Sequence, residues 1–392
     1  MNTVYIVAAA RTPIGSFGGV FAATPAPRLG ASAIEAALAR SGVPKEKVEQ
    51  VYMGCVLQAG IGQAPARQAG IYAGLPPACG AVTVNKVCGS GMKSVMLGAN
   101  DLRTGEFEVV LAGGMENMSQ VPYYLPAARN GYRMGHGEVV DGMIFDGLWD
   151  PYHNKHMGTC GDLCASTLKF TRAEQDAFAL ESYRRASGAW ADGTFAAEVS
   201  PVLLPQKKGD PVRVEKDEEP FRLKADKVAT LRPAFGADGT VTAANASKIN
   251  DGAAALVLAS EGAVKALGLK PLARIVAQAS HAQEPEWFST APIEAAKKAL
   301  SRAGMNLSDI DLFEVNEAFS VVAMAFIREL ALDPAHVNVL GGAVALGHPI
   351  GASGARILVT LLNALKARGK SRGLAAICIG GGEATAMIVE RV

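Results

Sequence analysis

The sequence predicts an α/β protein made of two related halves, with an inserted segment between them. Short apolar runs alternate with helical patterns over residues 3–118, and the same alternation resumes after Asp251. Strands that alternate with helices imply a parallel sheet that is covered on both faces. The second half repeats the order and approximate spacing of the first, which indicates a duplication. Residues 119–250 are instead rich in proline and charge.

Composition limits the classes of function. The chain has 392 residues, 49% of them hydrophobic, which is enough for a large core. A net charge of +1 excludes a broad nucleic-acid surface or a general attraction to anionic membranes. No apolar run is long enough to span a bilayer, and we expect Met1–Arg11 to be a first strand and not a signal peptide. The six cysteines have no Cys-x-x-Cys pair, so we expect no disulfide framework, no metal site and a cytoplasmic location.

The first half contains the elements of a covered sheet. A buried strand is expected over residues 3–10, followed by the loop Arg11–Gly15. A helix over residues 29–41 is ended by Gly42 and Pro44. The remaining pattern predicts a strand at 48–56, a helix at 66–73, a strand at 81–84, a helix to about residue 103 and a strand at 109–112 that runs into Gly113-Gly114-Met115-Glu116.

Cys88 stands at the turn between a predicted strand and a predicted helix. Unpaired backbone N–H groups and the helix dipole favour an anion there, so we expect this thiol to ionise more easily than free cysteine and to act as a nucleophile. The alternative is a small buried cysteine without chemistry. A dinucleotide-binding turn is disfavoured, because Gly89 and Gly91 lack a third glycine and the acidic residue that should follow.

The middle segment, residues 119–250, is expected to lie over the core. A charged run at 207–227 predicts a solvated surface. One long helix is expected at 171–189, opened by a capping box of Thr171 and Glu174. Prolines interrupt the rest of the segment, among them Pro122, Pro126, Pro151, Pro201, Pro205, Pro211 and Pro220.

The second half predicts a site that is shared by both halves. Its pattern is a strand at 311–315, a helix at 318–330, a strand at 337–339, a turn at 347–354, a helix at 355–368 and a strand that ends at Cys378-Ile379-Gly380-Gly381-Gly382. On this alignment Cys88 and His348 occupy equivalent turns. Ligands bind at the carboxyl ends of strands, so we expect Cys88, His348, Cys378 and Asn316 to converge. Taken alone, Asn316 could simply cap a helix and Cys378 could be a core residue.

These residues resemble the thiolase family, and within it the short-chain acetoacetyl-CoA thiolases. The matching motifs are Asn85-Lys86-Val87-Cys88-Gly89-Ser90-Gly91-Met92, Ala112-Gly113-Gly114-Met115-Glu116, Asn245-Ala246-Ser247 with Asn250-Asp251-Gly252-Ala253-Ala254, Asn316-Glu317-Ala318-Phe319, Gly347-His348-Pro349-Ile350-Gly351 and Cys378-Ile379-Gly380-Gly381-Gly382. The resemblance implies duplicated βαβαβαββ halves in a five-layer α/β/α/β/α core. It divides the chain into residues 1–118 with 251–268, an inserted coenzyme A-binding loop domain at 119–250, and residues 269–392.

The resemblance also implies an acyltransferase, an acetyl-CoA C-acetyltransferase that condenses two acetyl-CoA reversibly through an acetyl-cysteine. Such chemistry needs a nucleophile, a base and donors for two oxyanions. By resemblance, Cys88 accepts the acyl group and His348 takes its proton and donates to the second thioester oxygen. Asn316 fixes a water in that oxyanion site, Cys378 removes the α-proton, and the N–H groups of Gly380 and Cys88 form the other oxyanion hole.

The resemblance further implies acyl-CoA substrates, a homotetramer, and no cofactor besides the coenzyme A that is part of the substrate. His156 before Met157-Gly158 favours the short-chain branch over a 3-ketoacyl-CoA thiolase for longer chains, while Gly161-Asp162-Leu163 and Glu383-Ala384 depart from the family pattern. A coenzyme A-binding protein without turnover is a further alternative. The positions that match ligand contacts, each of which could instead serve packing or face solvent, are Leu148, His156, Met157, Arg222, Phe235, Ser247, Ala318 and Phe319.

Overall fold

The computed structural model describes residues 2–392 and contains the two halves that the sequence predicts. The first half consists of β1 (Val4–Arg11), β2 (Gly15–Ser16), α1 (Ala26–Ser41), β3 (Gln50–Gly54), α2 (Pro65–Tyr72), β4 (Gly80–Val84), α3 (Ser90–Thr104), β5 (Val109–Asn117), β12 (Asn250–Ser260) and α6 (Glu261–Ala266). The second half consists of β13 (Ala273–Ala282), α7 (Ala291–Ala303), β14 (Leu312–Val315), α8 (Ser320–Glu329), α9 (Ala343–Leu346), α10 (Ile350–Ala367), β15 (Arg372–Ile379) and β16 (Glu383–Arg391).

The strands of both halves form one hydrogen-bonded sheet. Its order is β14-β15-β16-β13-β1-β12-β5-β3-β4, with β2 paired to β12. The halves join where β1 pairs with β13, through Tyr5 opposite Arg274 and Ile6 opposite Ala273. β3 is parallel to both β4 and β5, and β14 is parallel to β15. The other long pairings are antiparallel, so the predicted parallel sheet describes only the outer part of each half.

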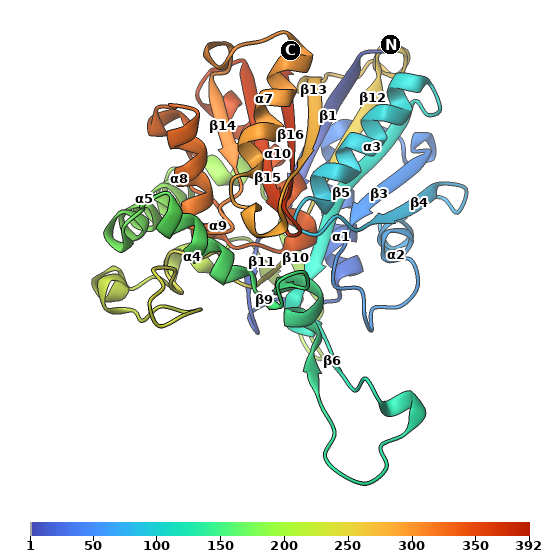
Figure 1. Ribbon diagram of the computed structural model, residues 1–392. Coiled ribbons are helices and arrows are strands. Elements are labelled where there is room, and N and C mark those ends of the chain that lie inside the picture. Colours follow the sequence, from blue (N-terminus) through green and yellow to red (C-terminus); the bar gives the residue numbers. More distant parts are fainter. Residues whose placement is uncertain (1) are drawn as a thin grey trace.

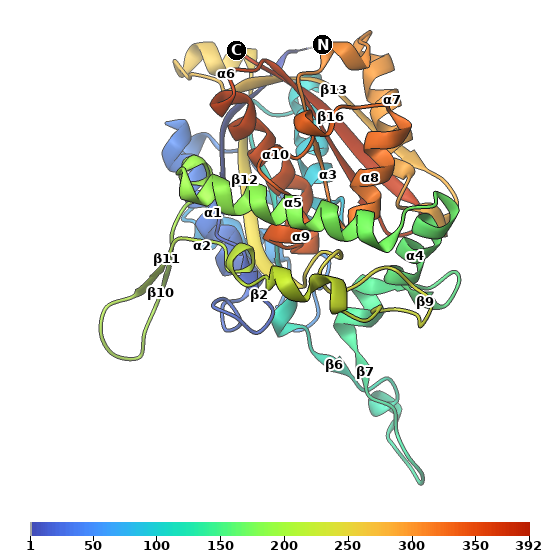
Figure 2. The same ribbon diagram turned by 90° about the vertical axis from the view of Figure 1, so that its left-hand side faces the viewer.

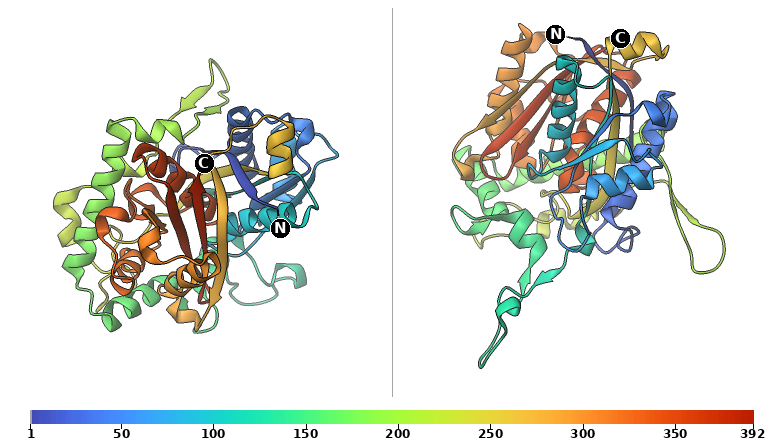
Figure 3. Two further views of the ribbon diagram at one scale, coloured as in Figure 1. Left: turned by 90° about the horizontal axis from the view of Figure 1, so that it is seen from above. Right: turned by 90° about the vertical axis from the view of Figure 1, so that its right-hand side faces the viewer.

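Helices form three layers around the two parts of this sheet, which confirms the predicted five-layer core. α1 and α2 cover the outer face of the first half, and α7 packs on the outer face of the second. α3 and α10 lie side by side between the two parts of the sheet (Figures 1 and 3). A Cβ atom at Gly91 would lie 2.7 Å from the backbone nitrogen of Ala355, so glycine permits this close approach of the two central helices.

The inserted segment does more than lie over the core. Besides α4 (Met157–Thr167) and α5 (Arg172–Ala191), it contains the short strands β6 (Tyr123–Tyr124), β7 (Val140–Asp141), β8 (Trp149–Asp150), β9 (Lys155–His156), β10 (Val202–Leu204) and β11 (Val212–Val214). α5 begins with the predicted capping box of Thr171 and Glu174. Ala179, Tyr183 and Ala186 of α5 are buried in the central core, with the spacing of one helical face.

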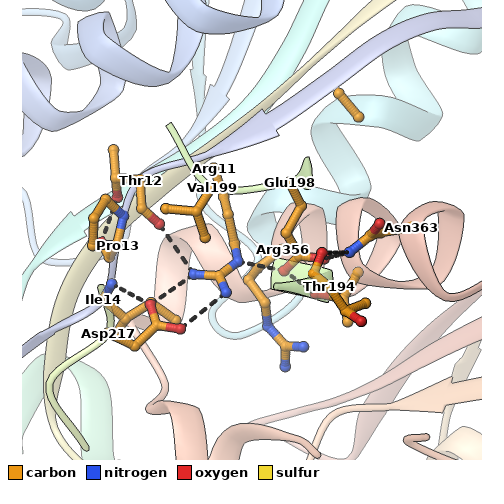
Figure 4. A network of polar contacts seen from close by, with 12 residues as sticks. Arg11, Thr12, Pro13, Ile14, Thr194, Glu198, Val199, Asp217, Arg356 and Asn363 are labelled. Carbon is orange, nitrogen blue, oxygen red and sulfur yellow. Dashed lines mark hydrogen bonds and ion pairs between the residues drawn. The ribbon is translucent and has the colours of Figure 1, made fainter. Parts of the chain in front are cut away.

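A buried ion network joins this segment to both halves (Figure 4). Arg11 at the end of β1 pairs with Glu198 at 2.5 Å and, through two nitrogens, with Asp217 at 2.7 and 2.9 Å. Asp217 also accepts hydrogen bonds from the Ile14 N–H and the Trp190 indole. Glu198 accepts from the Thr360 hydroxyl of α10 at 3.0 Å. One guanidinium therefore connects the first half, the inserted segment and the second half.

Two predicted boundaries differ in the structure. Residues 337–339 are not a strand: Val337 forms only an isolated bridge to Phe313. Asn338 has a φ of 47°, and its side-chain amide bonds the N–H and C=O of Val315 at 2.7 and 2.9 Å, replacing strand pairing. The helix expected from residue 355 begins at Ile350, because Gly351 and Gly354 do not form a turn: they lie within α10, where they let it pack closely against β5 and α3.

A long hairpin carried by β6 and β7 protrudes from the molecule (Figures 1 and 2). Its apolar side chains face solvent: Tyr123 is 65% exposed, Leu125 52% and Val139 61%, and Met134 is fully exposed. Among residues 2–392, no helix combines the length and apolar character needed to cross a membrane.

Candidate active site

Cys88 stands on a tight turn between β4 and α3. The Ser90 hydroxyl donates to the Val87 carbonyl at 2.6 Å and accepts from the Lys86 N–H at 2.8 Å, and Asn85 Oδ1 accepts from the Val87 N–H at 3.0 Å. Val87 has a φ of 44°, which a β-branched residue rarely adopts. These bonds hold a strained conformation immediately before the sulfur, as is common at functional sites.

The surroundings of Cys88 make its thiol harder to ionise, contrary to our expectation of easier ionisation. Burial raises the pKa of Cys88 to about 11. The backbone N–H groups of Gly380 and of Cys88 itself oppose this rise, while the charge of Glu116 adds to it. Desolvation thus raises the pKa of Cys88 by more than the backbone N–H groups at the helix N-terminus lower it. The sequence pattern alone does not show which of the two effects is larger.

His348 is held as a neutral imidazole in one tautomer. Its Nδ1 lies 2.6 Å from the Ser353 hydroxyl oxygen, and that hydroxyl donates to the Pro349 carbonyl at 2.9 Å. Because the hydroxyl hydrogen is used there, the oxygen accepts from Nδ1–H and Nε2 keeps its lone pair. Burial and Arg356 lower the pKa of His348 to about 3. Nε2 is therefore available as a base at neutral pH.

The backbone of His348 is fixed by a loop that the sequence analysis did not single out for this role. The His348 N–H donates to Asn250 Oδ1 at 3.1 Å and to the Lys248 carbonyl at 3.2 Å. Asn250 Nδ2 in turn donates to the Gly15 carbonyl at 2.9 Å. Asn250 belongs to one of the motifs that resemble the thiolase family, so the sequence did mark it as a residue of interest. Its hydrogen-bond partner His348 lies 98 residues away, and the motif alone does not reveal that contact.

Asn316 and Cys378 are fully buried and line neither of the two cavities described below. Asn316 Nδ2 lies 3.5 Å from His348 Nε2, and Asn316 Oδ1 is buried without a partner among the described residues. A small polar molecule would satisfy this oxygen. Burial raises the pKa of Cys378 well above its usual value, and the nearby thiols of Cys88 and Cys164 contribute to the rise.

Gly380 follows Cys378 in the turn between β15 and β16, and its N–H interacts with the Cys88 sulfur. The same turn is linked to the Cys88 turn by an ion pair of Lys86 and Glu383. Glu383 is one of the positions that depart from the family pattern. Here it joins the two turns, which come from different halves of the chain.

Two adjoining cavities lead to Cys88 and His348. The inner cavity, of about 320 Å³, is lined by Cys88, His348 and Gly380 among others. The outer cavity, of about 490 Å³, shares several wall residues with it, including Leu148, His156, Ser247, Phe319 and His348. Within residues 2–392 there is no group of three or more His, Cys, Asp or Glu side chains that could hold a metal ion.

All eight predicted ligand contacts line one or both cavities. Met157 and Ala318 line the inner cavity, Arg222 and Phe235 the outer one, and Leu148, His156, Ser247 and Phe319 line both. The His156 ring stacks on Phe235 at 4.5 Å, and Phe235 meets Phe319 edge-on at 6.1 Å. His156 Nδ1 accepts the Gly158 N–H at 3.0 Å and caps α4. An apolar wall with few polar groups suits a long, thin ligand.

Two family models match the chain in succession. The model described as thiolase, N-terminal domain, matches residues 4–262, and that described as thiolase, C-terminal domain, matches residues 269–391. Among curated proteins, the acetyl-CoA acetyltransferase of Cupriavidus necator is 52% identical and that of Schizosaccharomyces pombe 51% identical. Each match covers all of both chains.

Solved structures have the same fold. A thiolase named Acat5 from Ascaris suum, determined in complex with coenzyme A, superposes with a TM-score of 0.95 at 46% identity over the whole of both chains. The acetyl-CoA acetyltransferase of Bacillus anthracis gives a TM-score of 0.97 at 40% identity, covering 100% of this chain and 99% of that one.

Proposed function

Because the chain belongs to the thiolase family, we propose that it is an acetyl-CoA C-acetyltransferase, which joins two acetyl-CoA into acetoacetyl-CoA and coenzyme A and also catalyses the reverse reaction. One observation carries the proposal. Cys88, His348 and Gly380 line one cavity, and Cys378 and Asn316 lie directly behind it. This set supplies a nucleophile, a base, a second thiol and oxyanion donors in one place.

In the first half-reaction the Cys88 sulfur attacks the thioester carbonyl of acetyl-CoA. Both groups are neutral at rest, so His348 Nε2 takes the thiol proton during the attack. The N–H groups of Cys88 and Gly380 stabilise the oxyanion. The carbon–sulfur bond to coenzyme A then breaks, and His348 gives the proton to the departing sulfur, leaving acetyl-Cys88.

In the second half-reaction one proton remains between two groups of the acetylated site: either the Cys378 sulfur or His348 Nε2 can hold it. When His348 holds it, Cys378 is a thiolate that removes an α-proton from the second acetyl-CoA. The protonated imidazole and a water on Asn316 donate to the thioester oxygen of the resulting enolate. The new carbon–carbon bond forms as the carbon–sulfur bond to Cys88 breaks. His348 then returns its proton to the Cys88 sulfur, which restores the resting site.

The two cavities hold the long arm of the substrate. The stacked His156 and Phe235, with Phe319, provide the apolar wall for the pantetheine chain. Arg222 lines the outer cavity and contacts the adenine or phosphate end. No other cofactor is needed, because the reaction exchanges one thioester for another and moves only protons.

Substrate length provides the test of this proposal. Phe288 is buried, lines the inner cavity and meets Phe319 edge-on at 6.2 Å, and we infer that it limits the length of the acyl chain. We expect kcat/KM for thiolysis of acetoacetyl-CoA to exceed that for 3-ketooctanoyl-CoA and 3-ketohexadecanoyl-CoA by about tenfold or more. Initial rates with purified protein measure this ratio. A preference for the longer substrates would instead assign the chain to fatty-acid β-oxidation.

We also propose a cytoplasmic homotetramer and a three-part division of the chain. Six unpaired cysteines suit a reducing compartment. Pairing of β12 with β5 and β1 supports placing residues 251–268 with residues 1–118. Six of the eight ligand contacts come from residues 119–250, which supports a coenzyme A-binding role for that segment, and residues 269–392 form the second half.

The protruding hairpin is the surface that this assembly would use. We expect Leu125→Glu combined with Met134→Glu to convert the tetramer into a smaller species, because both side chains are exposed and apolar at present. Light scattering coupled to size-exclusion chromatography measures the mass. Leu203→Glu, which charges another exposed apolar side chain on the β10–β11 hairpin, serves as the control. An unchanged mass in the double variant would contradict this role of the hairpin.

A further inference from the structure

Lys248 follows Ser247 in the chain and lines the outer cavity, but it takes no part in the proposed chemistry. Its ammonium nitrogen donates to the Ala246 carbonyl at 2.7 Å, the Val344 carbonyl at 3.2 Å and the Ala244 carbonyl at 3.4 Å. It also lies 5.6 Å from the centre of the Tyr183 ring. Three carbonyl oxygens and an aromatic face therefore surround one cation.

The bonds of Lys248 join two segments that position catalytic groups. Ala244 and Ala246 belong to the loop that carries Ser247 and leads into β12 at Asn250, and Val344 lies in α9, four residues before His348. The Val344 N–H donates to the Glu317 carboxylate at 3.1 Å, so Val344 is held at both its N–H and its C=O. The Lys248 carbonyl itself accepts the His348 N–H.

The surroundings keep this lysine charged near neutral pH. Burial lowers the pKa of Lys248 to about 8, and the carboxylates of Glu219 and Glu317 oppose that fall. Tyr183 and His348, the other titratable groups that lie close to it, are neutral, since burial raises the pKa of the tyrosine and lowers that of the histidine. The carbonyl oxygens thus face a cation that the chain supplies itself.

We propose that Lys248 is a positioning residue whose ammonium acts as a tethered monovalent cation, binding the Ala244–Ala246 loop to α9 and thereby fixing His348 for catalysis. The inference rests on the proposed acetyltransferase activity for its kinetic consequence. Its structural consequence is independent of that activity: removal of the lysine side chain leaves a cradle of carbonyl oxygens that a free monovalent cation can fill.

The experiment compares two variants. In Lys248→Ala we expect kcat for acetoacetyl-CoA thiolysis to fall about 10- to 100-fold with a smaller change in KM, because His348 loses its support. Added ammonium or potassium chloride should restore most of this rate, whereas tetramethylammonium chloride at equal ionic strength should not. Lys248→Met should lose a similar amount and recover nothing, because its side chain fills the space without a charge.

A second readout does not depend on turnover. Potassium should raise the melting temperature of Lys248→Ala more than tetramethylammonium does, and should not do so for the wild type. The exposed Lys270→Met, in the turn before β13, should show neither effect. A wild-type kcat in Lys248→Met, or no cation effect on rate and melting in Lys248→Ala, overturns the proposal. If the wild type failed to turn over acetyl-CoA, the proposed function would fail while the melting test still decided this inference.

Discussion

Replacement of Cys88 with alanine is expected to abolish formation of the acetyl-enzyme and to lower kcat by a factor on the order of 10⁴ or more. Cys88 is the only cysteine among the described residues that line the inner cavity, and its sulfur meets the N–H groups of Gly380 and of Cys88 itself, so its loss removes the thiol that this oxyanion site serves. Intact-protein mass spectrometry after brief treatment with acetyl-CoA measures the adduct. The wild type should gain one acetyl group, and Cys88→Ala should gain none.

Cys378→Ala is the matched control, because it removes the other thiol of the site. We expect this variant to become acetylated, and to hold the acetyl group longer than the wild type, since it lacks the base that activates the second acetyl-CoA. Its rate of condensation should fall as strongly as that of Cys88→Ala. An acetyl adduct that persists in Cys88→Ala, or a Cys378→Ala variant that condenses normally, would show that the two roles are assigned wrongly.

The raised pKa of Cys88 predicts how its reactivity depends on pH. A thiol with a pKa of about 11 is almost wholly protonated at neutral pH, and its thiolate fraction rises about tenfold per pH unit up to pH ~10. Alkylation of Cys88 by iodoacetamide, followed by peptide mass spectrometry, should therefore accelerate steadily from pH 7 to about pH 9. A plateau below about pH 8 would mean that the helix N-terminus dominates after all.

Loss of the guanidinium of Arg11 is the second large effect that we expect. Arg11→Met leaves the carboxylates of Glu198 and Asp217 buried without their cation, which should lower the free energy of unfolding by about 3–5 kcal/mol. The midpoint of urea unfolding, measured at one fixed protein concentration, gives the change.

Arg274→Met provides the comparison for Arg11→Met. Arg274 pairs with Glu390, but its side chain is 45% exposed, so its loss should cost only about 0–1 kcal/mol. An Arg11→Met variant that unfolds at the same urea concentration as Arg274→Met would show that the buried network contributes nothing beyond a surface ion pair.

The positions of Cys88, Asn316 and Cys378 at or near the ends of strands made their convergence predictable. Cys88 follows β4, Asn316 follows β14 and Cys378 lies near the end of β15, so strand patterns and the duplication sufficed to bring them together. The burial of Cys88 was not predictable, because segments from the other half of the chain cover it. The pKa of Cys88 depends on the Gly380 turn, which comes nearly 300 residues later in the sequence.

Partners that are distant in sequence account for the other differences. Arg11 finds the carboxylates of Glu198 and Asp217 187 and 206 residues away, and Asp217 belongs to the charged run at 207–227 whose pattern predicted a solvated surface. Asn338 uses its side chain to replace strand pairing, which a pattern of apolar residues does not reveal. The role of Lys248 is visible only in the three carbonyl groups that surround its ammonium group, and the sequence pattern does not reveal them.

The pairing of β1 with β13 explains why a duplicated protein of this kind stays on one chain. Each half, if separate, would present a row of unsatisfied peptide groups along β1 or β13, and such exposed edges recruit other chains into aggregates. Joined edge to edge, the halves protect each other at that seam. A gene split at the seam would therefore yield two fragments that are prone to precipitate, whichever residues of the site each of them carried.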